Sequence, residues 1–243
     1  MKRMVGKVPA VLMSLAMAFT MIPMVGRTTY CLITDLDPVS GYTFAEDTKV
    51  GGTLTAKMAA GKTNLTISWN MIHGASGYDI FFAQCSHSEK NVACKNVETI
   101  TASKILKWTT SGLKEGTPYQ AYVSAYVMEN GRKSYVSTSP MVHAYTGNGT
   151  KNYNNARSVS VNKTKVTLER GESFMIKGKV NKVSKKKKLM PKSHAPKLRY
   201  MTSDSKVASV SSDGMIAANG KGKCTVYVYA HNGVSKSVNV TVK

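Results

Sequence analysis

Acidic side chains are scarce in this sequence. The 243 residues include 13 Asp and Glu against 34 Lys and Arg, a formal net charge of +21 at pH 7. Four basic residues lie in an N-terminal leader, so 21 − 4 leaves +17 on the remainder: Lys2, Arg3, Lys7 and Arg27. Such an excess favours acidic partners, which include a polyanionic cell wall, an anionic membrane surface and nucleic acid.

Motifs of the common enzyme classes are missing. The chain has no G-x-S-x-G elbow, no Walker loop and no pair of catalytic carboxylates. Its histidines follow no H-E-x-x-H or comparable spacing, and His73 or His143 beside abundant serines does not indicate a catalytic triad. The five are His73, His87, His143, His194 and His231. We therefore expect a non-enzymatic protein without cofactor or metal.

Cysteine is also rare, with four residues. Cys85 and Cys94 flank a predicted turn, so they can face each other across a hairpin. In an exported protein we predict a disulfide here, worth about 2.5 kcal/mol for so short a loop; the alternative is two independent thiols. His87 alone does not complete a metal site with them. Cys224 alternates with inward residues, which predicts a small core hydrophobe.

Long apolar runs are confined to the N-terminus. Residues 1–7 carry three basic side chains, and an uncharged apolar run follows over residues 8–26. This order is typical of a secretory signal, which we place at residues 1–31. The alternative is an uncleaved anchor, because the run is between the usual lengths of a signal core and a membrane span. No later segment is long and apolar enough to span a bilayer, so we expect a secreted or cell-wall-associated protein.

The chain after the leader reads as two strand-rich domains. Residues 32–52 are polar and turn-rich and predict a lead-in, although residues 42–44 would also suit an extra edge strand. From Thr53, apolar residues alternate with polar ones at the spacing of strands. A Gly- and Asn-rich segment, 147–157, predicts a linker between domains at 53–146 and 158–243. The predicted fold class is all-β, two tandem immunoglobulin-like β-sandwiches after an N-terminal signal segment.

The first domain resembles a fibronectin type III domain. Trp69 lies on the predicted second strand, and Leu113 stands six residues before Tyr119 across Lys-Glu-Gly-Thr-Pro. The resemblance implies a tyrosine corner, in which the Tyr119 ring is buried and its hydroxyl group bonds back to the backbone.

The second domain resembles the bacterial immunoglobulin-like group 2 (BIG2) domain. The likeness rests on Ser-Asp-Ser-Lys-Val-Ala-Ser-Val, a Gly-closed hairpin and then Gly-Lys-Gly-Lys-Cys-Thr-Val; Tyr200 stands where that family usually has tryptophan. In the last of these strands Cys224, Val226, Val228 and Ala230 are expected to face the core.

Two predicted surfaces are candidates for binding. Alternation along two predicted strands points three aromatic side chains away from the core: Phe81, Tyr122 and Tyr126. They could stack on sugar rings or bind a protein; the alternative is that they pair across the strands and stabilise the sheet. The second surface is a basic insertion that would attract phosphate or sulfate polymers, or is simply a solvated loop. Its residues are Lys182, Lys185, Lys186, Lys187, Lys188, Lys192, Lys197 and Arg199.

These features give two functional hypotheses. The resemblances imply a monomeric, non-enzymatic adhesion or display protein that binds a surface glycan or protein ligand. The basic insertion suggests instead an accessory module that binds a cell-wall polyanion or carbohydrate. Export and the lack of aromatic residues within the lysine run argue against nucleic acid as the partner.

The leader gives the first testable prediction. Because signal peptidase recognises a basic start, an apolar middle and a small-residue exit, the exported protein should lack residues 1–31 or nearly so. Intact-mass measurement of protein from culture medium checks this. Recovery of the full-length form, or of membrane-bound material only, would contradict it.

Overall fold

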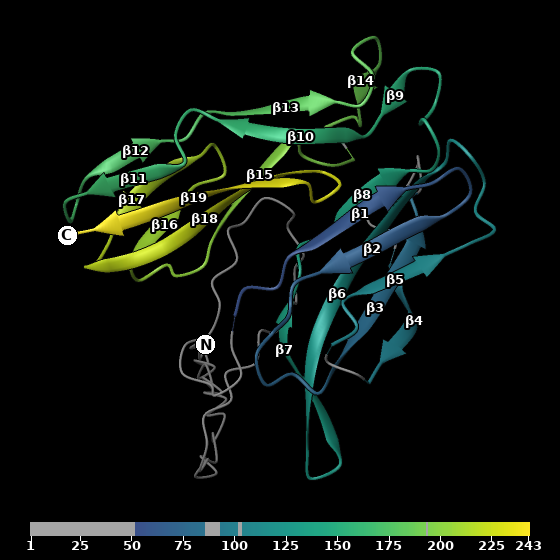
Figure 1. Ribbon diagram of the computed structural model, residues 1–243, viewed down its shortest axis with the longest axis horizontal. Coiled ribbons are helices and arrows are strands. Elements are labelled where there is room, and N and C mark those ends of the chain that lie inside the picture. The colour runs from purple at the N-terminus through teal and green to yellow at the C-terminus, as the bar shows by residue number, and fades with distance from the viewer. Residues whose placement is uncertain (1–51, 86–92, 102–103, 193) are drawn as a thin grey trace, which may run out of the picture.

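The computed structural model describes residues 52–85, 93–101, 104–192 and 194–243, and these are folded into strands joined by turns (Figure 1). No helix occurs among them, and so none that is long and apolar enough to cross a membrane. The predicted leader lies outside the described residues, as does the predicted lead-in except for Gly52. The all-β fold class is confirmed.

The first sandwich consists of two antiparallel sheets. One has the strand order β1-β2-β5 and the other β4-β3-β6-β7, with β8 also paired to β6. The strands are β1 (Ala56–Ala60), β2 (Leu65–Trp69), β3 (Gly77–Gln84), β4 (Lys95–Ile100), β5 (Lys107–Thr110), β6 (Pro118–Glu129), β7 (Arg132–Thr138) and β8 (Val142–Tyr145).

Alternation places the core of this sandwich as the sequence predicts. In β2, Leu65, Ile67 and Trp69 are buried, while the two residues between them are partly exposed. The opposite sheet contributes Tyr78 and Ile80, which are fully buried. Successive side chains of a strand point to opposite faces, so each sheet presents one apolar face to the other.

A tyrosine corner closes the connection into β6. The Tyr119 ring is buried, and its hydroxyl oxygen accepts a hydrogen bond of 3.3 Å from the backbone N–H of Lys114. The ring also stacks on Phe82, with 5.3 Å between the ring centroids. The predicted corner is therefore confirmed.

The second sandwich contains a four-stranded sheet, order β11-β19-β18-β15, in which β11 and β19 are parallel. A three-stranded sheet, β12-β17-β16, and the pairs β10-β13 and β14-β9 accompany it. The strands are β9 (Tyr153–Asn154), β10 (Ala156–Val161), β11 (Lys165–Leu168), β12 (Ser173–Met175), β13 (Gly178–Lys182), β14 (Lys188–Leu189), β15 (Leu198–Thr202), β16 (Ala208–Val210), β17 (Met215–Ala218), β18 (Gly222–Ala230) and β19 (Ser235–Val242).

The core of the second sandwich follows β18. Cys224, Val226, Val228 and Ala230 are all buried within one apolar cluster, as predicted. Tyr229 has the opposite parity and is nevertheless buried, because the Arg199 guanidinium group lies over its ring at 5.4 Å from the centroid.

The turn between β18 and β19 docks on the first sandwich. The backbone N–H of Met58 donates to the Asn232 carbonyl oxygen at 2.9 Å, and that of His143 donates to the His231 carbonyl oxygen at 2.7 Å. Gly233 has a φ of 80°, and a Cβ atom there would lie 2.0 Å from the Ala56 carbonyl oxygen. Only glycine meets both conditions without a backbone shift.

The segment predicted as the linker is structured where the sandwiches meet. It contains β9 and the first residues of β10. The Asn155 side chain accepts from the N–H of Tyr145 at 2.9 Å and donates to the Tyr145 carbonyl oxygen at 2.8 Å. This pair of bonds ties the start of the second sandwich to the last strand of the first.

Two substitutions test the first core. Trp69→Ala should lower the free energy of unfolding by about 3 to 5 kcal/mol because it leaves a large cavity, and Tyr119→Phe by about 1 kcal/mol because it removes one partly buried hydrogen bond. Hydrogen exchange of the full chain should show the faster exchange in β2, β3 and β6, with β18 much less affected. An unchanged β2 in Trp69→Ala would contradict the inward placement of Trp69.

Candidate functional site

The basic insertion lies between β13 and β15 and is a built loop. Its short strand β14 pairs in parallel with β9, so that Lys188 lies opposite Tyr153. Figure 1 shows β14 and β9 together at a projecting end of the molecule. The loop is thus held by backbone pairing to the segment that joins the two sandwiches.

Five lysines of the insertion are exposed: Lys185, Lys186, Lys188, Lys192 and Lys197. No acidic residue occurs between Glu172 and Asp204 in the sequence, so the insertion supplies no counter-charge of its own. These five exposed lysines make the insertion strongly basic, and we call them the lysine face.

Two other lysines of the insertion hold the loop together. The Lys182 ammonium group donates to the carbonyl oxygens of Lys185 and Lys187. The Lys187 ammonium group donates to the carbonyl oxygen of Asn148 at 2.9 Å, in the predicted linker. Both side chains therefore have partners within the fold that fix the shape of the lysine face.

Arg199 does not belong to the lysine face. It is 7% exposed, and besides covering Tyr229 it donates to the His231 carbonyl oxygen at 3.4 Å. Its charge lies where the two sandwiches meet. The prediction that Arg199 contributes to a surface for polyanions does not fit this burial.

The predicted aromatic surface is largely a set of rings packed on one another. Phe81 and Tyr122 lie opposite each other on β3 and β6 and stack with 4.5 Å between centroids and 8° between planes. Tyr135 meets Phe81 edge-on at 6.3 Å. Tyr126 is only 3% exposed, beneath the Lys133 ammonium group at 4.2 Å. This arrangement favours the cross-strand alternative, and the burial of Tyr126 does not fit an outward role.

A buried carboxylate supports the same sheet. Asp79 is 1% exposed and accepts hydrogen bonds from the Lys133 ammonium group, the Tyr135 hydroxyl group and the Thr99 hydroxyl group at 2.6–3.0 Å. Burial would raise the pKa of Asp79, but the bonds from Tyr135, Lys133 and Thr99 outweigh it and lower that pKa. The pKa of Tyr135 is raised, mainly by burial and to a smaller extent by its hydrogen bond to Asp79.

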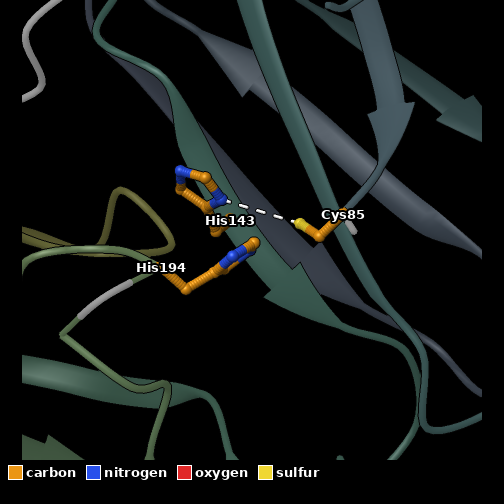
Figure 2. Close-up of side chains that lie close together, drawn as sticks. All are labelled: Cys85, His143 and His194. Carbon is orange, nitrogen blue, oxygen red and sulfur yellow. Dashed lines mark hydrogen bonds between the residues drawn. The ribbon is translucent and has the colours of Figure 1, made fainter. Parts of the chain in front are cut away.

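A cluster of Cys85, His143 and His194 lies between the two sandwiches (Figure 2). Cys85 directly follows β3, His143 is in β8, and His194 comes from the connection between β14 and β15. The Cys85 Sγ atom is 3.7 Å from Nδ1 of His143, and the two imidazole centroids are 5.1 Å apart at 72°. Each residue offers one donor atom within 4.8 Å of the others.

Burial keeps the groups around this cluster uncharged. Burial lowers the pKa of His143 well below the usual range for histidine, and the nearby Arg199 charge lowers it further. The same two causes lower the pKa of His231 to about 4. Burial, with Cys94 as a second cause, raises the pKa of the Cys85 thiol. At neutral pH these shifts favour neutral imidazoles at His143 and His231 and a protonated thiol at Cys85.

The structure contains Cys85 and Cys94 as thiols, and the disulfide between them stays a prediction. Burial raises the pKa of Cys94 to about 11, and its Sγ atom lies 3.9 Å from the Gln120 carbonyl oxygen. His87 and most of the intervening turn lie outside the described residues.

Sequence reasoning missed the Cys-His cluster because its members come from three distant segments. Sequence spacing identifies metal ligands that share a hairpin or a helix. Cys85, His143 and His194 instead come together only because the two domains dock. The sequence alone could show only a cysteine at the end of a predicted strand and histidines near the domain junction.

The Asp79 network gives a pH prediction. Asp79→Asn should lower the free energy of unfolding by about 1.5 to 3 kcal/mol at pH 7, since it weakens bonds to a charged group while Lys133 can turn toward water. The folded pKa is lowered, so this contribution is present above the unfolded pKa of about 3.9 and is lost as pH falls through the folded value.

Urea unfolding of wild type and variant between about pH 2 and 7 measures this difference. The exposed Glu98→Gln on neighbouring β4 is the control and should stay near wild type. A wild-type advantage that persists undiminished at the lowest pH would show that the Asp79 charge is not its source.

Comparison with known proteins identifies an Ig-like family for the second sandwich. Residues 155–242 match the model of the bacterial Ig-like domain (group 2) family. No curated protein matches the chain. Among solved structures, the FN5 domain of Drosophila Lar is 17% identical, with 40% of this chain and 96% of that one covered and a TM-score of 0.30.

Two further solved structures are similarly distant. FN3tt is 20% identical over 42% of this chain and all of its own, with a TM-score of 0.30. Pectate lyase PelI from Erwinia chrysanthemi is 12% identical over 48% of this chain and 31% of the lyase, with a TM-score of 0.31. These weak likenesses say nothing about activity. The family match therefore covers the second sandwich, residues 155–242, as a bacterial Ig-like domain of group 2.

Proposed function

We propose that this is a non-enzymatic, exported surface protein whose lysine face binds an acidic polymer of the cell surface and thereby serves adhesion or display. The observation that carries the proposal is the exposure of five lysines on one fixed loop without an acidic residue among them. The fibronectin-like and Ig-like sandwiches support the role of a module that presents a surface.

The shape of the loop strengthens this reading over a merely solvated one. Lys182 and Lys187 draw the backbone of the insertion together by their bonds to its carbonyl oxygens and to Asn148. Fixing the loop limits how far its exposed ammonium groups, which repel one another, can move apart. A polymer of phosphate or sulfate groups removes that repulsion on binding, and the preformed loop loses little conformational entropy.

The aromatic surface gives weaker support for a glycan or protein ligand. Phe81 and Tyr122 use their faces on each other, and Tyr126 is covered. We therefore place the polymer contact on the lysine face.

Salt dependence tests the proposal. Replacing Lys185, Lys186 and Lys188 with Gln should weaken binding to purified anionic wall polymer, or to heparin as its substitute, and should flatten the fall of affinity with salt. Each lost phosphate or sulfate contact removes about 0.7 to 0.9 from the slope of log K against log salt, if the polymer resembles a nucleic acid in charge density. Lys187 is left in place because its side chain bonds to Asn148.

A matched variant separates local from overall charge. Lys165, Lys221 and Lys223 are exposed lysines of the same domain outside the insertion, and their replacement with Gln removes the same three charges. This control should keep most of the affinity and the wild-type slope. Equal losses in the two triple variants would show that net charge alone attracts the polymer, and no loss in either would refute the proposal. Thermal stability of both should stay within about 0.5 kcal/mol of wild type.

A further inference from the structure

We propose that Cys85, His143 and His194 bind one zinc ion, which ties the basic insertion of the second sandwich to the first sandwich. The site is separate from the lysine face and does not depend on the function proposed above. Its three ligands come from both sides of the junction, so metal binding would act on how the two sandwiches are held together.

The positions of the donor atoms suit a tetrahedral ion. With zinc at about 2.0 to 2.3 Å from nitrogen and sulfur donors, the donors of one tetrahedron lie about 3.3 to 3.8 Å apart. The Cys85 Sγ and His143 Nδ1 atoms are already 3.7 Å apart, and all three donors lie within 4.8 Å of one another. The His194 donor lies within 4.8 Å of both, so a movement of its side chain toward them would complete three corners, and Figure 2 shows the three side chains pointing toward one another.

The donor types select the metal class. One thiolate and two imidazoles are soft and borderline ligands, which suit zinc, whereas calcium and magnesium require oxygen ligands. Cys85 and His143 are 3% and 5% exposed, so bulk water competes little for the two corners they provide. Among the described residues no Asp or Glu belongs to the group.

The backbone fixes each ligand where the site needs it. The N–H of Cys85 donates to the Pro118 carbonyl oxygen at 3.0 Å, and that of His143 crosses the junction to the His231 carbonyl oxygen. On the insertion, the N–H groups of His194 and Ala195 both donate to the Pro191 carbonyl oxygen. Ala195 is buried against the first sandwich in a small apolar cluster with Tyr145, which anchors the turn that presents His194.

His231 is an independent sign that a group is needed at this junction. Its side chain is 1% exposed, and its Nε2 atom has no hydrogen-bond partner among the described residues. Its carbonyl oxygen accepts from the His143 N–H at 2.7 Å, which places the residue beside one of the proposed ligands. Buried polar atoms without a partner are rare, and a bound ion with its water is one explanation. With three protein ligands, a tetrahedral zinc ion would take a water molecule at its fourth corner.

Zinc binding and the predicted disulfide exclude each other at Cys85. A sulfur atom bonded to Cys94 cannot also be a thiolate ligand, so the site needs the reduced form, which is the form in the structure. Peptide mapping of freshly isolated, unreduced protein therefore forms part of the test. A Cys85–Cys94 link in most of the molecules would overturn the proposal.

Cobalt(II) reports the site directly. Untagged, reduced, metal-free full chain titrated with Co²⁺ should develop a thiolate-to-cobalt absorption band and tetrahedral visible bands at one equivalent, and Zn²⁺ should displace both. His194→Ala should weaken Co²⁺ binding by more than about 100-fold, because even the loss of a residue that only orients a ligand costs 10- to 100-fold. Cys85→Ala should abolish the thiolate band.

Matched variants keep the result interpretable. Cys224→Ala removes another buried thiol and His73→Ala an exposed imidazole, and both should bind Co²⁺ as wild type does. His194 is only partly buried, so the metal-free His194→Ala protein should unfold at nearly the wild-type temperature, while added Zn²⁺ should raise the melting temperature of wild type and not that of His194→Ala. Absence of a thiolate band in wild type, or unchanged binding in His194→Ala, would refute the site.

Discussion

The backbone bonds between the β18–β19 turn and the first sandwich are the contact on which the rest of the arrangement depends. The turn places the carbonyl oxygens of His231 and Asn232 against N–H groups of β8 and β1. Each bond satisfies a backbone group that the docking removes from water, whereas the side-chain atoms His231 Nε2 and Asn232 Oδ1 of the same turn are buried without a hydrogen-bond partner among the described residues. Gly233 makes the approach feasible, because any side chain there would meet the Ala56 carbonyl oxygen.

This docking gives neighbouring residues roles that a single sandwich would not. Tyr229 has an outward parity on β18 and is nevertheless buried under Arg199. Arg199 in turn reaches the His231 carbonyl oxygen, so a cation that reads in the sequence as part of a basic surface contributes to the junction. The same approach brings the insertion next to β8 and creates the Cys-His cluster.

The fold was predictable from the sequence because its signals are local. Alternation in β2 and β18 reports which side chains face a core, and the spacing from Leu113 to Tyr119 reports a corner formed within one connection. The aromatic surface was predicted less well, since parity gives the side of a sheet but not what covers it. Lys133 covers Tyr126 through a contact that no strand pattern encodes.

The candidate sites were less predictable because they depend on contacts between distant segments. Net charge located the basic insertion, yet only the bonds of Lys182 and Lys187 distinguish lysines that shape the loop from those that face solvent. The spacing of Cys85, His143 and His194 along the sequence does not indicate that they lie together. They are separated by whole strands, and the packing that joins them involves two domains, each of which has its own core.

The two proposed sites share one segment, so binding at one would affect binding at the other. His194 lies in the sequence between Lys192 and Lys197, so an ion that holds His194 against the first sandwich also restrains the loop that carries the lysine face. A restrained insertion loses less conformational entropy when a polymer binds. In the other direction, a polymer that neutralises the lysines of the insertion reduces their repulsion, so the insertion more easily occupies its position against the first sandwich. Because linkage is reciprocal, the polymer must then strengthen metal binding by the same factor as the metal strengthens polymer binding. The coupling would disappear in His194→Ala, which leaves every lysine in place.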